Sequence, residues 1–158
     1  MDLIRNGEVL AVGDDFVPDG NGLPDSEPIT ISAERWLAHT RELRHRGKVS
    51  VRLTGGFEVE RLAGQLAGLD RVEVDFPTFT DGRGYTVARL LRERLGYRGE
   101  LRAVGDVLPD QLGYLLRCGF DAFRLKPGKS ADTALAALRQ LPLSYQPAAD
   151  AVPPRWRV

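Results

Sequence analysis

The sequence predicts an α/β protein in which four successive βα units form a mainly parallel sheet. Segments with strand-like alternation begin near residues 49, 72, 101 and 120. A segment with the helical spacing of apolar residues follows each of them. The links are short, which is typical of parallel strands joined by right-handed crossovers. An N-terminal β-hairpin with its loop and one helix precede these units, over residues 1–30 and 31–47.

The first 30 residues are predicted to form an acidic hairpin and a loop. They contain seven acidic residues and a single basic one, Arg5. The apolar pairs Leu3-Ile4 and Val9-Leu10 flank Asn6-Gly7, a dipeptide that favours the tight type I′ turn. Residues 18–28 contain three prolines and are predicted as loop.

Helices are predicted before, between and after the strands. Ser32 is a suitable N-cap for the first helix, which we expect to continue to Arg46 and to end at Gly47. Pro109 suits the first turn of a later helix, and Gly119 suits its end. The units fill residues 48–141, with helices over 58–66, 83–95, 109–118 and from Ser130 to Leu141. A proline-rich tail, residues 142–158, is expected to wrap the surface or a partner.

Composition excludes several classes of protein. A chain of 158 residues with 42% hydrophobic and 28% charged residues fits one soluble domain. Its 22 basic and 22 acidic residues balance, which argues against nucleic-acid binding. The single cysteine, Cys118, rules out a disulfide framework and a cysteine-built metal site, and we expect no metal. No apolar run reaches membrane-spanning length, so we expect a cytoplasmic protein without membrane contact.

The sequence leaves two sheet architectures open. Four βα units equal half of an eightfold βα barrel, and the alternative is an open, doubly wound sheet. In both, ligands bind at the carboxyl ends of the strands, so the loops that follow the strands should contain the functional residues. The open side of a half-barrel would expose apolar strand faces, which predicts a homodimer or a tight partner.

The loop after the second of these strands is the richest candidate for a binding site. A helix amino end and the Arg83 guanidinium would attract sulfate, sulfite, phosphate or a carboxylate. In the simpler, structural interpretation, Asp81 caps the helix and Arg83 pairs with Asp81 or with Asp75. Val87 stands where a dinucleotide motif has its third glycine, which argues against nucleotide binding. The predicted ligand-binding residues of this loop are Thr78, Thr80, Asp81, Gly82, Arg83, Gly84 and Tyr85.

Loops after the third and fourth strands add further candidates. Asp106 can act as a general base or simply as a turn or helix cap, and Gln111 beside it is a predicted ligand-binding residue. Lys126 and Arg124 alternate along the last strand and either point into the site or lie on a solvated edge. Lys126 is included among the predicted ligand-binding residues. Asp106 and Arg83 are the predicted catalytic residues, and their two loops should face each other across one pocket.

Three long motifs resemble one bacterial family. The first is Phe76-Pro77-x-Phe79-x-Asp81-Gly82-Arg83-x-Tyr85, which continues through the arginine-rich stretch 88–103. The others are Gly105-Asp106-Val107-Leu108-x-Asp110-Gln111 and Arg117-Cys118-Gly119-Phe120-Asp121-x-Phe123. Together, over residues 74–125, they look like the bacterial domain-of-unknown-function family number 934.

The resemblance implies a role in assimilatory sulfate and sulfite reduction. Genes of this family typically lie beside those for sulfite reductase and phosphoadenylyl-sulfate reductase, and many members are labelled as oxidoreductases of sulfite reduction. The implied function is that of an accessory protein that binds sulfite reductase, a related sulfur-assimilation enzyme or its electron donor. The alternative is a small oxidoreductase-type enzyme acting on an oxyanion or a nucleotide-like substrate. No motif identifies a cofactor. If the protein transfers electrons, the cofactor must be a flavin or be held by the partner.

Overall fold

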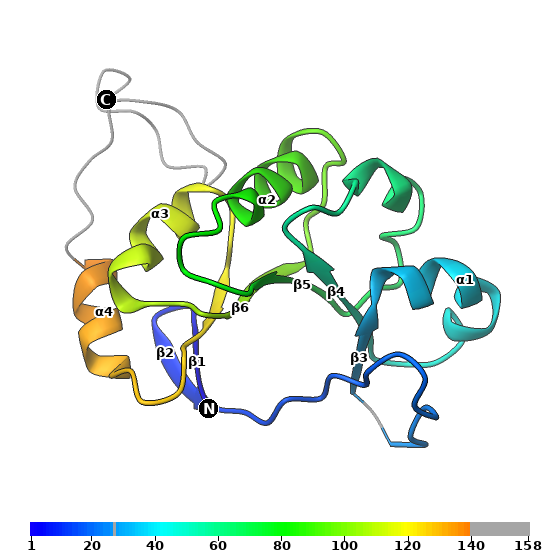
Figure 1. The fold of residues 1–158 in the computed structure, drawn as a ribbon, viewed down its shortest axis with the longest axis horizontal. Helices are drawn as coiled ribbons and strands as arrows, with labels where there is room; N and C mark the ends of the chain where they lie inside the picture. The colour runs from blue at the N-terminus through cyan, green and yellow to red at the C-terminus, as the bar shows by residue number, and fades with distance from the viewer. Residues whose placement is uncertain (27, 140–158) are drawn as a thin grey trace.

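The computed structural model, which describes residues 1–26 and 28–139, contains one open and mostly parallel sheet (Figure 1). Its seven strands lie in the order β2-β1-β7-β6-β5-β4-β3. Five neighbouring strands are parallel: β3 (Ile29–Ser32), β4 (Val49–Thr54), β5 (Arg71–Phe76), β6 (Glu100–Gly105) and β7 (Ala122–Arg124). The predicted α/β class is therefore confirmed.

The helices lie on one side of this sheet (Figure 1). The parallel strands follow one another in chain order, so each right-handed crossover places its helix on the same face. The sheet is therefore open with its helices on one face (Figure 1), which argues against the doubly wound alternative. The helices are α1 (Ala33–Leu43), α2 (Arg83–Glu93), α3 (Leu112–Arg117) and α4 (Ala131–Arg139), with short 3₁₀ turns η1 (Val59–Leu62) and η2 (Pro109–Gln111).

An antiparallel hairpin extends the sheet beyond β7. Strands β1 (Asp2–Arg5) and β2 (Glu8–Ala11) pair with each other, and β1 also pairs antiparallel with β7. Asn6 and Gly7 take positive φ angles of 53° and 78°, as a type I′ turn requires. The predicted hairpin is confirmed, and it occupies the edge where a further parallel strand would otherwise pair.

Several predicted boundaries differ from the structure. Residues 29–32 form strand β3, where a loop and a helix start were predicted, so a fifth parallel strand precedes the four expected ones. The expected helix 58–66 is only the 3₁₀ turn η1. Helix α1 ends at Leu43, although Ser32 caps it through a 3.0 Å hydrogen bond from the Arg35 backbone nitrogen, as predicted. The predicted helix end at Leu141 and the tail 142–158 lie outside the described residues.

The two faces of the sheet differ in chemistry. On the helix side, alternate strand residues such as Val51, Val74 and Leu101 are completely buried and belong to one core that also contains Trp36 of α1. The residues between them point to the opposite side and are largely charged. On the neighbouring strands β4, β5 and β6 the open side therefore carries Arg52, Glu73 and Arg102 in place of the expected apolar side chains, and the predicted homodimer stays a prediction. No helix in the described ranges is long and apolar enough to cross a membrane.

Candidate functional site

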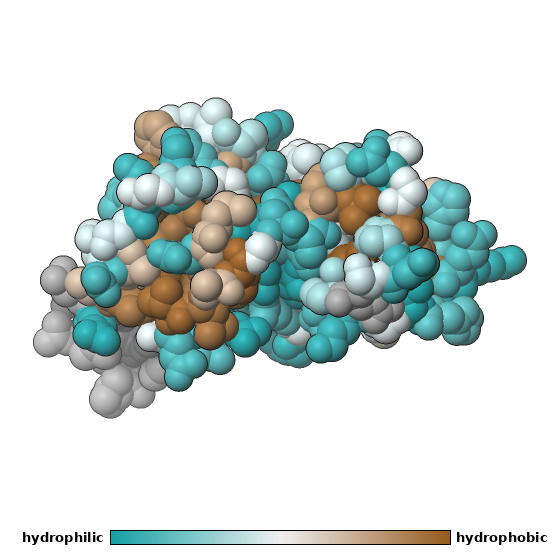
Figure 2. Space-filling view, turned by 90° about the horizontal axis from the view of Figure 1, so that it is seen from below, coloured by the Kyte–Doolittle hydropathy of each residue, from teal (hydrophilic) through white to brown (hydrophobic). Residues whose placement is uncertain are grey.

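The open side of the sheet carries a cluster of charged side chains, which we call the polar face. The register of the paired strands places Arg52, Glu73 and Arg102 side by side on β4, β5 and β6. Figure 2 views the molecule from below, from the side opposite the helices, and shows a hydrophilic band between two hydrophobic areas. The polar face consists of Arg52, Arg71, Glu73, Asp75, Arg102 and Arg124.

Glu73 lies at the centre of the polar face and is fully buried. Its carboxylate accepts hydrogen bonds from Arg52 Nε at 2.9 Å and from Arg71 Nε at 3.1 Å. Arg102 Nη1 lies 3.4 Å from Oε1, and Arg124 Nη2 lies 3.8 Å from Oε2. One buried carboxylate therefore faces four guanidinium groups, so further negative charge is needed to balance the cluster.

The N-terminal segment, residues 12–19, supplies that charge from outside the sheet. Asp14 Oδ1 lies 2.7 Å from Arg52 Nη2 and 3.1 Å from Arg124 Nη1. Burial alone would raise the pKa of Asp14, but the hydrogen bond from Arg52 and the two positive charges hold it below its usual value. Asp15 accepts a hydrogen bond from Arg71 at 2.6 Å, and the Phe16 ring stacks 4.2 Å from the Arg52 guanidinium.

A cavity of about 170 Å³ opens on the polar face at the carboxyl ends of β5, β6 and β7. We call it the Asp75 cavity, after the carboxyl group of Asp75 on β5 that lines it. Ligands of parallel α/β proteins bind at this edge of the sheet. The cavity is lined by Met1, Asp14, Arg52, Asp75, Gly105, Arg124, Leu125 and Pro127.

Arg124 is the most unusual member of this lining. Only 4% of its side chain is exposed, yet it forms no well-oriented hydrogen bond with any described residue. Its contacts are the ion pairs with Asp14 and Glu73. Buried polar groups are nearly always hydrogen-bonded, so a buried guanidinium without such a bond beside a cavity is the feature expected of an anion site.

The loops predicted to form the site do lie together. Asp106 Oδ2 accepts a hydrogen bond from the Phe79 backbone nitrogen at 3.1 Å, and Gln111 Nε2 donates to the Phe79 carbonyl oxygen at 3.0 Å. Lys126 Nζ lies 2.8 Å from Asp106 Oδ1, and the hydrogen bond from Lys126 lowers the pKa of Asp106. These groups thus join the loops after β5, β6 and β7, and their charges neutralise one another.

Asp81 and Arg83 pair with each other, as the structural interpretation predicted. Arg83 Nε and Nη2 donate to the two Asp81 oxygens at 2.9 and 2.7 Å, and the Arg83 backbone nitrogen donates to Oδ1 at 3.2 Å. The bonds from Arg83 lower the pKa of Asp81 to about 2. Arg83 does not pair with Asp75, and its side chain is 68% exposed, outside the Asp75 cavity. The hydroxyl groups of Thr78 and Thr80 lie 3.2 Å apart on the exposed loop.

The two glycines beside Arg83 have different surroundings. A Cβ atom added to Gly84 would come 2.6 Å from the Phe76 ring, whereas one added to Gly82 would meet nothing within 4 Å. Gly84 therefore allows α2 to lie close to β5. The space beside Gly84, which was predicted to face a ligand, is occupied by the Phe76 ring. Tyr85 packs between aromatic rings, with centroids 5.3 Å from Phe76 and 4.9 Å from Tyr114. This part of the predicted site is a packing contact.

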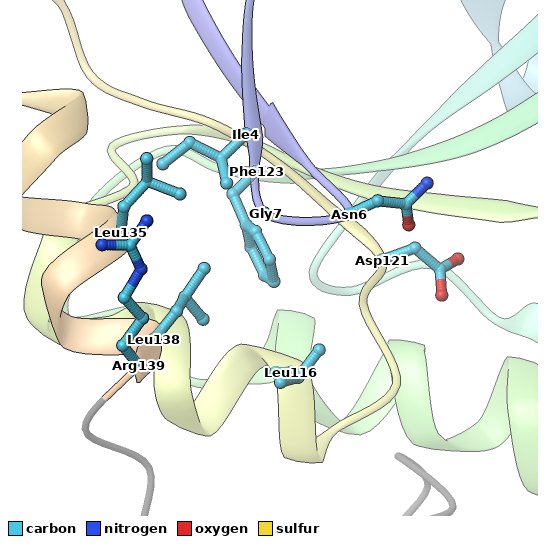
Figure 3. Close-up of a pocket in the computed structure, with 9 residues that line it drawn as sticks. All are labelled: Ile4, Asn6, Gly7, Leu116, Asp121, Phe123, Leu135, Leu138 and Arg139. Atoms are coloured by element: carbon cyan, nitrogen blue, oxygen red, sulfur yellow. The ribbon is translucent and has the colours of Figure 1, made fainter.

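A larger cavity, of about 310 Å³, lies between the hairpin, α3 and α4 (Figure 3). Ile4, Phe123, Leu135 and Leu138 line it, so its character is mainly apolar. Its one acidic residue, Asp121, is already held by the Arg92 guanidinium. The described residues contain no group of three or more histidine, cysteine or acidic side chains placed to hold a metal ion. Of these two cavities, the Asp75 cavity has the chemical groups suited to a polar ligand.

Arg124 was a candidate from the sequence, but most of the other residues of the polar face were not predicted. The missing signal is visible in the strand sequences, where Arg52, Glu73 and Arg102 alternate with apolar residues. Parallel strands covered by helices on both faces are nearly continuous apolar runs. Charged residues between apolar neighbours in three successive parallel strands therefore indicate a sheet with one polar face.

Comparison with known proteins supports the resemblance seen in the motifs. A search of curated proteins finds no match to the chain. A family model described as "Bacterial protein of unknown function (DUF934)" matches residues 50–156. This range includes strands β4 to β7, with every arginine of the polar face, and covers well over half of the chain. The chain therefore belongs to the DUF934 family of bacterial proteins.

Proposed function

We propose that this protein is a cytoplasmic accessory protein of assimilatory sulfate and sulfite reduction that binds a small oxyanion in the Asp75 cavity. It would present that oxyanion to sulfite reductase, to a related sulfur-assimilation enzyme or to its electron donor. The pathway follows from the family resemblance. The observation that carries the oxyanion site is the buried Arg124 guanidinium, which lines the cavity and makes no well-oriented hydrogen bond.

Two arginines give the cavity its preference for anions. Arg52 donates through Nε and Nη2 to Glu73 and Asp14, which leaves Nη1 without a hydrogen bond among the described residues. Arg124 Nη1 is buried and has no hydrogen-bond partner among the described residues, although it lies 3.1 Å from Asp14 Oδ1. Guanidinium groups bind oxyanions through paired, charge-assisted hydrogen bonds, which are stronger in a partly buried site than in water. A cavity of about 170 Å³ suits a sulfite, sulfate or phosphate ion with a few water molecules.

The charged loop residues predicted from the sequence do not bind the anion in this proposal. Lys126 and Asp106 neutralise each other, and Arg83 is occupied by Asp81. We therefore assign anion binding to Arg124 and Arg52. The exposed loop around Phe79, which is 53% exposed, would be available to a partner protein or to a second copy in a homodimer.

A second candidate function is a small enzyme of the oxidoreductase type. The observation that favours it is the Asp75 carboxyl group, which shares the cavity with Arg52 and Arg124. Reduction of an oxyanion consumes protons, and a carboxyl group beside the anion is a suitable general acid. The electrons would have to come from a flavin or from a partner, because no motif in the sequence identifies a cofactor.

Titration calorimetry with sulfite, sulfate and phosphate tests the oxyanion site. We expect Arg124→Gln to weaken binding at least about tenfold, because a hydrogen bond to a charged group contributes about 1.5–3 kcal/mol. Arg89→Gln is the matched control, since Arg89 is half exposed on α2 and pairs with Glu93. Equal affinity in wild type and Arg124→Gln, or no binding of any of the three anions, would overturn the site.

Growth of a deletion strain tests the pathway. A strain without this protein should fail to grow on sulfate or sulfite and should grow when given sulfide. Complementation with wild type should restore growth on sulfate, and complementation with Arg124→Gln should not. Normal growth of the deletion strain on sulfate would refute the role in sulfite reduction.

A further inference from the structure

Asp75 is a carboxyl group without a partner at the edge of a highly charged cluster. Among the described residues it takes part in no hydrogen bond and no ion pair, unlike Asp14 and Asp106 nearby. Its Oδ1 atom lies against Gly105, where an added Cβ would come within 2.6 Å of it. Gly105 has no side chain, so the carboxyl group remains open to the Asp75 cavity.

Charged groups face Asp75 from every element around it. Arg52 on β4 and Arg124 on β7 are positive, whereas Glu73 on the same strand and Asp14 in the N-terminal segment are negative. Met1 also lines the cavity, and its amino group donates a 3.2 Å hydrogen bond to the Val12 carbonyl oxygen. The site therefore contains positive groups that hold an anion and a carboxyl group that would repel it when ionised.

The balance of these influences raises the pKa of Asp75 above its usual value. Burial raises the pKa of Asp75, and Glu73 and Asp14 raise it further, against the opposing effect of Arg52 and Arg124. The other carboxyl groups with a displaced pKa in the described part of the chain, among them Asp14 and Asp106, are shifted downward. Asp75 is thus the one of these carboxyl groups whose pKa is raised.

We propose that the Asp75 cavity binds an oxyanion together with one proton, which Asp75 holds and donates as a hydrogen bond to an oxygen of the anion. This inference rests on the proposed oxyanion site. A neutral carboxylic acid offers one O–H donor, whereas the ionised form accepts only. An incoming anion adds negative charge beside Asp75 and favours its protonation further. Anion binding and proton uptake at Asp75 therefore strengthen each other reciprocally.

The proposal also defines the class of ligand. Arg52 and Arg124 each donate to one oxygen or to a pair of oxygens, and Asp75 requires another oxygen with a free lone pair. Sulfite, sulfate and phosphate have at least three oxygens and satisfy this requirement. Chloride has no oxygen, and acetate has only two, so we expect both to bind more weakly and with less proton uptake.

Calorimetry in buffers of different ionisation enthalpy tests the proposal, because it counts the protons taken up with each anion. Sulfate is the best probe, since it stays fully ionised over the working range of pH. Above the pKa of Asp75, wild type should take up close to one proton per sulfate. Its affinity should fall about tenfold for each unit of pH.

Asp75→Asn keeps a neutral hydrogen-bond donor of the same shape. It should bind sulfate with an affinity that is independent of pH and with almost no proton uptake. Asp25→Asn, in the exposed loop before β3, is the matched control and should behave as wild type. Asp75→Ala, which removes the donor, should bind less tightly than Asp75→Asn, and thermal unfolding of each variant checks that it folds.

The outcomes separate this inference from the proposed function. Sulfate binding to wild type without proton uptake would overturn the role of Asp75 and leave the oxyanion site standing. Proton uptake that persists in Asp75→Asn would have the same consequence. Failure of wild type to bind sulfate, sulfite or phosphate at any pH would overturn both.

Discussion

Replacement of Gly105 by alanine should strongly destabilise the protein. Gly105 has a φ angle of +90°. An added Cβ atom would approach the Phe76 carbonyl oxygen to 2.4 Å and Asp75 Oδ1 to 2.6 Å. The carbonyl group has little freedom to move, because it accepts a 2.7 Å hydrogen bond from the Asp106 backbone nitrogen.

The magnitude follows from two separate costs. A non-glycine residue in the left-handed region costs about 1–2 kcal/mol. Overpacking against a fixed neighbour adds about 1–3 kcal/mol. The free energy of unfolding of Gly105→Ala should therefore fall by about 2–5 kcal/mol, a large share of the about 5–15 kcal/mol typical of a domain.

Gly128→Ala is a matched control for the first of these costs. Gly128 follows β7 with a φ angle of +81°, and a Cβ atom there would meet nothing within 4 Å. Urea unfolding followed by circular dichroism gives both free energies. The loss in Gly105→Ala should exceed that in Gly128→Ala by about 1–3 kcal/mol. Losses that agree within about 0.5 kcal/mol would show that the close approach described for Gly105 is absent.

Two further predictions concern charged groups. Glu73→Gln should lower the free energy of unfolding by about 3–5 kcal/mol, because it leaves buried arginines without their shared carboxylate. Glu42→Gln is the control, since the Glu42 side chain is 82% exposed on α1. Equal urea midpoints for the two variants would contradict the buried cluster. Arg83→Ala should return the pKa of Asp81 from about 2 toward 3.8, as measured by NMR titration of its carboxyl group. Because folding lowers the pKa of Asp81, the contribution of Asp81 to stability is present above pH 3.8 and is lost as the pH falls toward 2. Wild type and Arg83→Ala should therefore become equally stable near pH 2. An Asp81 pKa that stays near 2 in the variant would show that another group causes the shift.

The regular alternation of strand and helix patterns in the sequence made most of the fold predictable. The one strand that was not predicted, β3, was missed for a physical reason. Strand β3 is short, with Ile29, Thr30 and Ile31 buried, and it directly precedes the capping residue Ser32. A short apolar run between Pro28 and a helix cap resembles a loop that enters a helix. What makes it a strand is its pairing with β4, a contact with residues about 20 positions later in the chain.

The candidate site was less predictable, because it depends on which face of each strand meets the helices. The contact between the loops at Phe79 and Asp106 followed from the rule for parallel strands. The rule did not indicate that Arg83 would be occupied by Asp81 two residues away. Nor could it reveal that Asp14, from a segment predicted as loop, would complete the cluster around Arg124. These contacts join residues that are adjacent only after the sheet has formed.

The pairing of β1 with β7 affects how the chain can fold during synthesis. Leu3 and Ile4 are almost fully buried, and their neighbours in the sheet include Phe123 and Arg124. A ribosome adds about 5–20 residues per second, so the hairpin waits on the order of 6–24 s before its partner strand has been made. During that time its apolar side chains lack their final cover. The hairpin therefore emerges well before β7 but reaches its native position only after β7 has been made.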